Sequence, residues 1–366
     1  MFENSRDWTI VTYDRSFLKA LFAFLESQHQ PGTDKGRLDE SYYAWKLHDT
    51  PCGDGAAGLA VTTTGRVIGS TVASLKPFLF RGEPIAAAEM GDSYTHPDFR
   101  RQGILSRVSQ RARDTVLHNP ATVIYTTPNE LSVGGYLKQG YRQPDWYRVT
   151  YWVRPQRFLT LCNRSLPRPL APPVAATLRT GTALASLVLA PRPARDLTWH
   201  TVDRFPADVN RIWNSGSQRF QFVRVRDVDT LDWRFRMSGR LPYQYLLCRQ
   251  NNTPVGFAVT ATVSIKGLRV LLLADYFFSA ETDWTRATLT LLSLLSRNRE
   301  HDLLGTWLLR SRALHAAYAP TSSQMFRLGF LPLKNMNLLF DPQSLPESYL
   351  DSPFPFHFTM SDSDNI

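Results

Sequence analysis

Apolar segments separated by short turns with proline or glycine predict strands and helices along most of the chain. Residues 85–95 are largely apolar and predict a strand, residues 96–103 form a Pro/Gly turn, and residues 105–117 predict a helix. Such a turn directs successive backbone N–H groups, and the positive end of the helix dipole, toward one point. The sequence therefore predicts an anion site, suited to a pyrophosphate, at the start of this helix.

The turn has the pattern Arg-x-x-Gly-x-Leu, with Arg100, Gly103 and Leu105 at its fixed positions. This pattern resembles the acyl-CoA-binding loop of the GNAT superfamily of N-acyltransferases, although Leu105 stands where that family usually has glycine or alanine. The resemblance implies that backbone N–H groups of the loop hold the pyrophosphate and that Arg100 and Arg101 add positive charge. It also implies that the pantetheine arm lies along the strand end before the loop. The cofactor-binding residues expected on this basis are Tyr94, Thr95, Arg100, Arg101, Gln102, Gly103, Ile104, Leu105 and Asn129.

The order of elements downstream carries the same resemblance. Residues 123–127 predict a strand, Asn129 follows it, Tyr136 comes seven residues later, and a Gly-Tyr pair at residues 140–141 closes the helix. This order resembles the second half of GNAT domains. It implies that Tyr136 protonates the departing sulfur of coenzyme A, and the alternative is a half-buried helix tyrosine that only packs. Asn129 is expected either to cap the following helix or to contact the pantetheine arm.

Acyl transfer to an amine also needs a base, because a free alkyl amine has a pKa of about 10. Glu89 and Asp92 stand near the end of the strand predicted at residues 85–95, beside alanines and a methionine. Partial desolvation in such surroundings favours general-base work by a carboxylate. Glu89 is preferred, because it lies six residues before Thr95, where the histone-modifying branch of the family carries its base. The alternatives are a carboxylate that only bonds a neighbouring side chain and an Asp92 that only shapes a bulge.

A second pass along the chain indicates a tandem duplication. A tryptophan followed by a basic residue, then two glycines, occurs twice, with 24 and 23 residues from tryptophan to the first glycine and 71 and 73 between glycines. The positions are Trp45, Gly69 and Gly140 in one unit and Trp233, Gly256 and Gly329 in the other. Each unit has a hairpin turn after its first glycine, at residues 81–82 and 266–267. The second unit lacks the Arg-x-x-Gly loop after its strand at residues 270–278, so only the first should bind CoA.

The expected fold class is α/β (α+β), with two tandem GNAT-like domains, each a mixed, mostly antiparallel sheet flanked by helices. The predicted divisions are an N-terminal GNAT domain at 1–153, a Pro/Arg-rich helical connector at 154–204, a degenerate GNAT-like domain at 205–340 and a tail at 341–366. The tail carries apolar and acidic residues that could pack on the body or extend an edge strand.

Composition narrows the class of protein. The chain of 366 residues suits two domains, and 43% hydrophobic residues suffice for buried cores. Three cysteines without a C-x-x-C pair favour a reducing compartment, and the histidines show no ligand spacing, so no metal is expected. The longest apolar stretch, residues 174–190, includes Arg179 and falls short of the ~20 apolar residues of a spanning helix. With no signal-peptide pattern at the start, a cytoplasmic location is expected.

The sequence thus predicts an N-acyltransferase that uses acetyl-CoA, or another acyl-CoA, as co-substrate. A small amine or amino sugar would attack the thioester directly in the first domain. The net charge of +10 indicates attraction to polyanions, and CoA itself is one. One alternative is a transferase of the Fem type, which is also a double GNAT-like protein, takes aminoacyl groups from tRNA, and generally lacks a well-formed pyrophosphate loop. The other is a non-catalytic CoA-binding protein. Apart from tRNA in the first alternative, nucleic acid is not expected as a partner, and the acceptor, acyl length and oligomeric state stay open.

Overall fold

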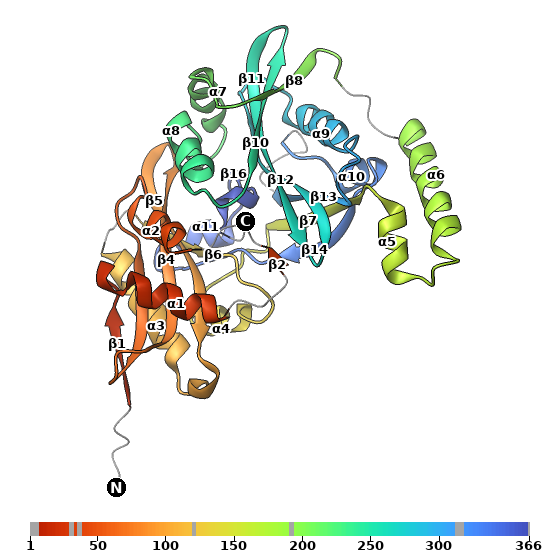
Figure 1. Ribbon diagram of the computed structural model, residues 1–366. Helices are drawn as coiled ribbons and strands as arrows, with labels where there is room; N and C mark the ends of the chain where they lie inside the picture. Colours follow the sequence, from red (N-terminus) through yellow and green to blue (C-terminus); the bar gives the residue numbers. More distant parts are fainter. Residues whose placement is uncertain are drawn as a thin grey trace.

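The structure is a computed structural model, and it describes residues 7–28, 33–34, 39–118, 122–189, 194–311 and 318–364. Two eight-stranded sheets form its framework (Figure 1). Most neighbouring strands in both sheets are antiparallel, and helices lie against the sheets. The predicted fold class is therefore confirmed.

The first sheet has the order β1-β3-β4-β5-β6-β15, with β9 beside β4 and β16 beside β9. Its only parallel pairs in the described part of the chain are β5 with β6 and β9 with β16. The strands are β1 (Trp8–Thr12), β3 (Ala56–Thr62), β4 (Val67–Phe80), β5 (Glu83–Thr95), β6 (Thr122–Thr126), β9 (Phe222–Arg224), β15 (Leu339–Phe340) and β16 (Phe356–His357).

The second sheet has the order β14-β7-β13-β12-β11-β10-β8, with β2 beside β11. As in the first sheet, a long hairpin is followed by a strand that pairs in parallel with it, here β12 with β13. The strands are β2 (Thr33–Asp34), β7 (Tyr147–Pro155), β8 (Leu197–Val202), β10 (Tyr243–Gln250), β11 (Thr253–Ile265), β12 (Leu268–Phe278), β13 (Leu303–Ser311) and β14 (Leu331–Met336).

The helices are distributed over both units, and α5 and α6 project to one side of the body (Figure 1). They are α1 (Leu18–Gln28), α2 (Glu40–His48), α3 (Ile104–Leu117), α4 (Val133–Lys138), α5 (Phe158–Ser165), α6 (Ala171–Leu189), α7 (Asp208–Ser217), α8 (Val228–Leu231), the π-helix η3 (Asp232–Met237), α9 (Trp284–Leu295), α10 (Ser322–Arg327) and α11 (Glu347–Asp351). Short 3-10 turns complete the list: η1 (Arg15–Phe17), η2 (Pro97–Phe99) and η4 (Met360–Asp362).

The segments that point to function form the elements predicted for them. β5 and α3 are joined by the Pro/Gly turn, β6 and α4 follow, and both hairpins turn at the predicted positions. Two close contacts fix α3 on the sheet, because a Cβ on Gly58 would lie 2.1 Å from the Val108 carbonyl oxygen, and one on Gly69 would lie 2.5 Å from Ile104 Cγ2. The glycines thus allow the first turns of α3 to approach β3 and β4 closely.

Strands cross between the predicted units. β7 begins in the first unit but pairs with β13 and β14, and the predicted boundary at residue 153 falls inside it. In return, β9, β15 and β16 of the second unit and tail join the first sheet. The tail therefore both packs on the body and adds a strand. The two sheets fit a tandem arrangement, and the duplication and the four-part division stay predictions.

Candidate functional site

The predicted anion site forms between the end of β5 and the start of α3. The turn η2 follows β5, and then Arg101 and Gly103 adopt left-handed backbone, with φ of 64° and 75°. Within the described ranges, the backbone N–H groups of residues 101–105 donate to no protein acceptor. The first turn of a helix leaves its N–H groups without intrahelical partners, and the positive end of the dipole coincides with them. Residues 101–103 are exposed to solvent and Leu105 is half-buried, so their donors are available to an anion, whereas Ile104 is buried.

Side chains of the loop hold it in place. Gln102 Oε1 accepts a hydrogen bond from Trp8 Nε1 at 2.9 Å, which ties the loop to β1. Leu105, the departure from the usual family pattern, is half-buried, and its Cδ2 lies 3.7 Å from where a Cβ would stand on Gly135 of α4. The leucine side chain thus faces α4, and its backbone N–H remains part of the loop. Arg100 is exposed, and its Nε donates to the carbonyl oxygen of Thr95 at 3.4 Å.

Beyond the loop, the ends of β5 and β6 enclose a polar cavity of about 170 Å³. Parallel pairing joins residues 86–89 to residues 122–125 and stops there. The register of β5 with β4 shifts nearby, between Ser70 and Val72 of β4. The lining of this polar cavity includes Glu89, Asp92, Tyr94, Asn129, Tyr136 and Asp364. The structure therefore brings together five of the predicted site residues, while the loop residues 100–105 lie outside this lining.

Tyr136 of α4 reaches the polar cavity from a buried position. Its side chain is 4% exposed, and its hydroxyl lies 2.7 Å from Ser93 Oγ. Burial raises the pKa of Tyr136 above its ordinary value, against hydrogen bonds with Ser93 and Thr126 that act to lower it. The phenol thus keeps its proton through the neutral range, as a proton donor must.

Glu89 is buried and its carboxylate is fully occupied. Oε1 accepts from Thr127 Oγ1 at 2.7 Å and from Ser363 Oγ at 2.9 Å. Oε2 pairs with Lys76 and accepts from the backbone N–H of Asp364 at 2.8 Å. A carboxylate offers about four acceptor positions, and all four are in use. This arrangement favours a structural role for Glu89.

Asp92 keeps an available oxygen. Its Oδ2 lies 2.8 Å from Lys46 Nζ, while Oδ1 has no hydrogen-bond partner among the residues that the structure describes. The side chain is 23% exposed and lines the polar cavity. Its backbone has a φ of 45°, which aspartate and asparagine tolerate better than most residues. Asp92 therefore lies in the bulge of β5 and also lines the polar cavity.

The chain's tail supplies a carboxylate to the same cavity, which the sequence analysis did not foresee. Asp364 Oδ2 lies 3.0 Å from Lys46 Nζ, and Oδ1 lies 3.0 Å from Lys76 Nζ. Burial acts to raise the pKa of Asp364, but the two lysines outweigh it and hold this pKa well below its usual range. Burial likewise acts to lower the pKa of Lys46, and Asp364 and Asp92 hold it well above. One side of the cavity is thus formed by paired charged side chains.

A second charged cluster anchors the tail deeper between the sheets. Arg226 Nη2 lies 2.7 Å from Asp362 Oδ2 and its Nε lies 3.1 Å from Asp275 Oδ1, with all three side chains fully buried. Arg224 joins the same two carboxylates at 3.2 and 3.3 Å. Paired in this way, the buried charges fix where the last residues of the tail lie.

Asn129 holds the turn that precedes α4. Its Oδ1 accepts hydrogen bonds from the backbone N–H groups of Leu131 and Ser132, at 3.0 and 3.1 Å. The N-cap of α4 itself is Ser132, so the predicted capping role of Asn129 stays a prediction. The residue also lines the polar cavity, so a contact with a pantetheine arm stays a prediction.

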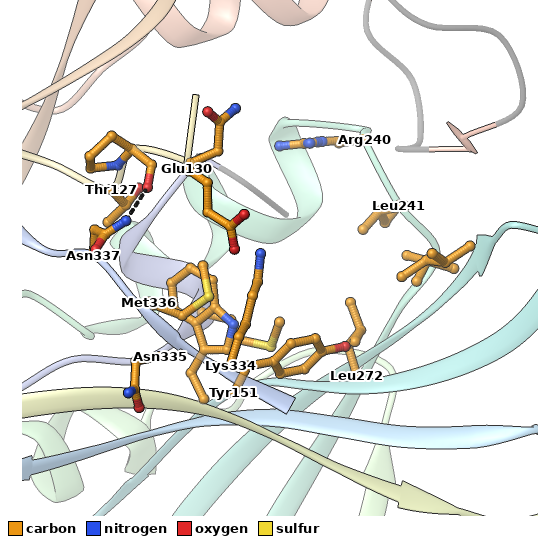
Figure 2. Close-up of a pocket in the computed structure, with 16 residues that line it drawn as sticks. Thr127, Glu130, Tyr151, Arg240, Leu241, Leu272, Lys334, Asn335, Met336 and Asn337 are labelled. Atoms are coloured by element: carbon orange, nitrogen blue, oxygen red, sulfur yellow. Dashed lines mark hydrogen bonds between the residues drawn. The ribbon is translucent and has the colours of Figure 1, made fainter. Parts of the chain in front are cut away.

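An apolar cavity of about 260 Å³ adjoins the polar cavity (Figure 2). Thr127, Pro128, Asn129 and Arg240 line both. The remaining lining is mainly apolar and comes largely from the second sheet. Its apolar members are Tyr151, Leu241, Val263, Ile265, Leu272, Trp307, Met336 and Met360, and its polar members are Glu130, Lys334, Asn335 and Asn337. None of these residues had been singled out, because strand residues of this type are also what a core requires.

Two searches of the described ranges gave no site of another kind. No group of three or more His, Cys, Asp or Glu side chains there could hold a metal ion. Among the helices of this part of the chain, none is long and apolar enough to cross a membrane.

Comparisons with known proteins agree on the fold. No protein-family model and no curated protein sequence matches the chain. Among solved structures, a probable N-acyltransferase of unknown function from Enterococcus faecalis V583 matches with a TM-score of 0.57 and 11% identity, covering 92% of this chain and 71% of that one. A GCN5-related N-acetyltransferase from Anabaena variabilis ATCC 29413 matches with a TM-score of 0.56 and 11% identity, covering 91% of this chain and 72% of that one. The Saccharomyces cerevisiae N-myristoyltransferase with bound myristoyl-CoA matches with a TM-score of 0.57 and 12% identity, covering 93% of this chain and 83% of that one. At these identities the likeness concerns the fold alone, and the chain has a GNAT-like fold.

Proposed function

We propose that the protein is an N-acyltransferase that moves an acetyl group from acetyl-CoA to a small amine or amino sugar. One observation carries the proposal. A loop with five backbone N–H donors free of protein partners leads, along the end of β5, to a polar cavity that holds Tyr136 and Asp92. The fold supports it, since similar structures include acyltransferases, one of them with a bound acyl-CoA.

The loop and the end of β5 would bind the donor. Residues 100–105 would hold the pyrophosphate through backbone N–H groups, and the exposed guanidinium groups of Arg100 and Arg101 would add charge. The pantetheine arm would then pass Thr95 and Tyr94, where β5 no longer pairs with β6. The thioester would reach the polar cavity beside Ser93 and Tyr136.

The reaction follows from the two titratable groups at that point. The amine nitrogen attacks the thioester carbonyl carbon, so a C–N bond forms and Asp92 takes the proton that the nitrogen loses. The C–S bond then breaks, and the thiolate takes its proton from Tyr136. Proton transfer from Asp92 to the phenolate through water restores both groups. Asp92 replaces Glu89 as the proposed base, because only Asp92 has an acceptor oxygen without a partner.

The proposal is tested by following thiol release from acetyl-CoA with a panel of amines. Release that depends on the amine supports an N-acyltransferase. Tight binding of acetyl-CoA without release would instead favour a non-catalytic CoA-binding protein. A salt-dependent gel shift with tRNA, together with no CoA binding, would favour the aminoacyl-tRNA alternative.

A further inference from the structure

Transfer of an acetyl group does not by itself require the apolar cavity. A methyl group needs little room, and the polar cavity already contains the proposed acid and base. Yet the apolar cavity lies next to the polar cavity, since Thr127 and Arg240 are among the residues that line both. An apolar recess beside reacting groups is the usual form of a small-molecule site.

The second sheet provides most of this recess. Tyr151 of β7, Leu272 of β12 and Met336 of β14 lie around the same space (Figure 2). Val263 of β11 and Trp307 of β13 also line it. Each of these strands belongs to the second sheet, and all but β7 also belong to the unit that lacks the anion loop. The second sheet thus contributes a wall of the site without contributing a donor loop.

The order of the two cavities decides which substrate reaches the recess. Tyr94, at the end of β5, lines the polar cavity, whereas no residue of β5 or of the loop lines the apolar one. A long acyl chain on CoA would have to pass Lys46, Asp92 and Asp364 before it reached apolar walls. These groups lose hydration when alkyl groups cover them, and they give little in return. A short acyl group stops before them.

An acceptor with a polar head and an apolar body matches both spaces. Its ammonium group would be attracted to the Asp92 carboxylate and would release one proton to solvent before the attack, and the neutral amine would then lose its second proton to Asp92 as the C–N bond forms. Its body would leave water for the walls formed by the second sheet. Each buried methylene strengthens such binding about fourfold.

Resting on the proposed function, we propose that the acceptor is a primary amine on an alkyl or aryl body. The amino group lies in the polar cavity beside Asp92, and the body lies in the apolar cavity. The second sheet is then the part of the protein that selects the acceptor.

The test compares acetyl transfer to butylamine, hexylamine, octylamine and ethanolamine at a fixed concentration of acetyl-CoA. The expected result is a rise in kcat/KM of about 10²-fold from butylamine to octylamine, with ethanolamine poorest. Ile265→Asn places an amide at a half-exposed position that lines the apolar cavity, and it should remove most of this rise. The matched control is Leu333→Asn, an exposed strand residue that lines neither cavity, and it should keep the rise.

Thermal protection by acetyl-CoA is measured in parallel, so that the two proposals fail separately. Equal transfer to polar and alkyl amines, with protection intact, would overturn the acceptor class and leave the acyltransferase standing. A preference for octanoyl-CoA over acetyl-CoA that Ile265→Asn abolishes would show the acyl chain in the recess and overturn the inference. No protection and no transfer to any amine would overturn both proposals.

Discussion

Replacement of Gly103 by valine should strongly weaken binding of acetyl-CoA while the fold persists. Gly103 has a φ of 75°, and a Cβ there would meet nothing within 4 Å, so the substitution strains the backbone without a clash. A β-branched residue in this conformation costs about 1–3 kcal/mol, which the loop relieves by turning. The N–H groups of residues 103–105 then lose their common direction. Loss of two hydrogen bonds to a phosphate, at about 1.5–3 kcal/mol each, weakens binding by about 10²-fold or more.

Gly82, at the turn between β4 and β5, offers a matched control. Its φ is 84°, and a Cβ on it also meets nothing within 4 Å, but it lies at the far end of the hairpin from the loop. Acetyl-CoA at about 100 times its dissociation constant should stabilise the wild type and Gly82→Val by about 2.7 kcal/mol. Thermal melts with and without ligand, or calorimetric titration, measure the difference. The reasoning is refuted if Gly103→Val keeps the full ligand shift, or if Gly82→Val loses as much.

Four further outcomes are expected. Tyr136→Phe should lower kcat by about 10²-fold or more without loss of acetyl-CoA protection. Because burial raises the pKa of Tyr136, the wild-type enzyme should lose this acid only at a higher pH than an ordinary tyrosine would. An unchanged kcat would remove the role. Asp92→Asn should lower kcat to a similar degree with a small change in melting temperature, since Asp92 is partly exposed and Lys46 keeps Asp364 as a partner. Glu89→Gln should mainly lower stability, by about 1.5–3 kcal/mol, because the buried Lys76 loses one of its two carboxylate partners and keeps Asp364. The reverse pattern in denaturant titrations and rates would restore Glu89 as the base. Burial lowers the pKa of His357 from 6.5 to about 4, so the unfolded chain binds this proton at a higher pH than the folded chain does. About 3 kcal/mol of stability should therefore be lost as the pH falls from 6.5 to 4. His357→Gln should flatten that part of a plot of urea midpoint against pH, and an unchanged slope would contradict the lowered pKa. Asp362→Asn should cost about 3–5 kcal/mol in urea unfolding, since two buried arginines lose a partner, and a cost below about 1 kcal/mol would contradict the anchoring role of the tail.

The parts of the site that local sequence could predict are those with local causes. The strand, turn and helix around the loop follow from apolar runs and from glycine at a left-handed position. Tyr136 lines the polar cavity, as the order of elements indicated, and Asn129 lies in the turn that precedes α4. In these segments, residues close together in the sequence are enough to predict the element.

The prediction of Glu89 rather than Asp92 as the base shows what local patterns cannot predict. The alanines around Glu89 predicted burial, and the residue is 3% exposed. What they did not show was Lys76 on the neighbouring strand. The hairpin turn at residues 81–82 held that signal, because its register pairs Lys76 with Ala87 and so sets the lysine diagonal to Glu89. Pairing the residues of the two strands outward from the turn would have predicted the ion pair between Lys76 and Glu89.

The rest of the site depends on contacts between distant parts of the chain. The backbone N–H of Asp364 donates to Glu89 across 275 positions, and β7 leaves its own unit for the second sheet. Acidic residues at the end of a chain usually lie in solvent, and nothing local to residues 361–364 distinguishes these. Only the buried lysines and arginines, each in need of a carboxylate, point to a partner from elsewhere.

The most direct test of the account is transfer of a labelled acetyl group. The protein is incubated with acetyl-CoA carrying carbon-13 at the carbonyl, together with octylamine, and the amine is examined by mass spectrometry. The account predicts labelled N-octylacetamide from the wild type and strongly reduced amounts from Tyr136→Phe, Asp92→Asn and Gly103→Val. Label that stays on CoA, or appears only as free acetate, would contradict the account, because the site would then bind or hydrolyse the donor without serving an amine.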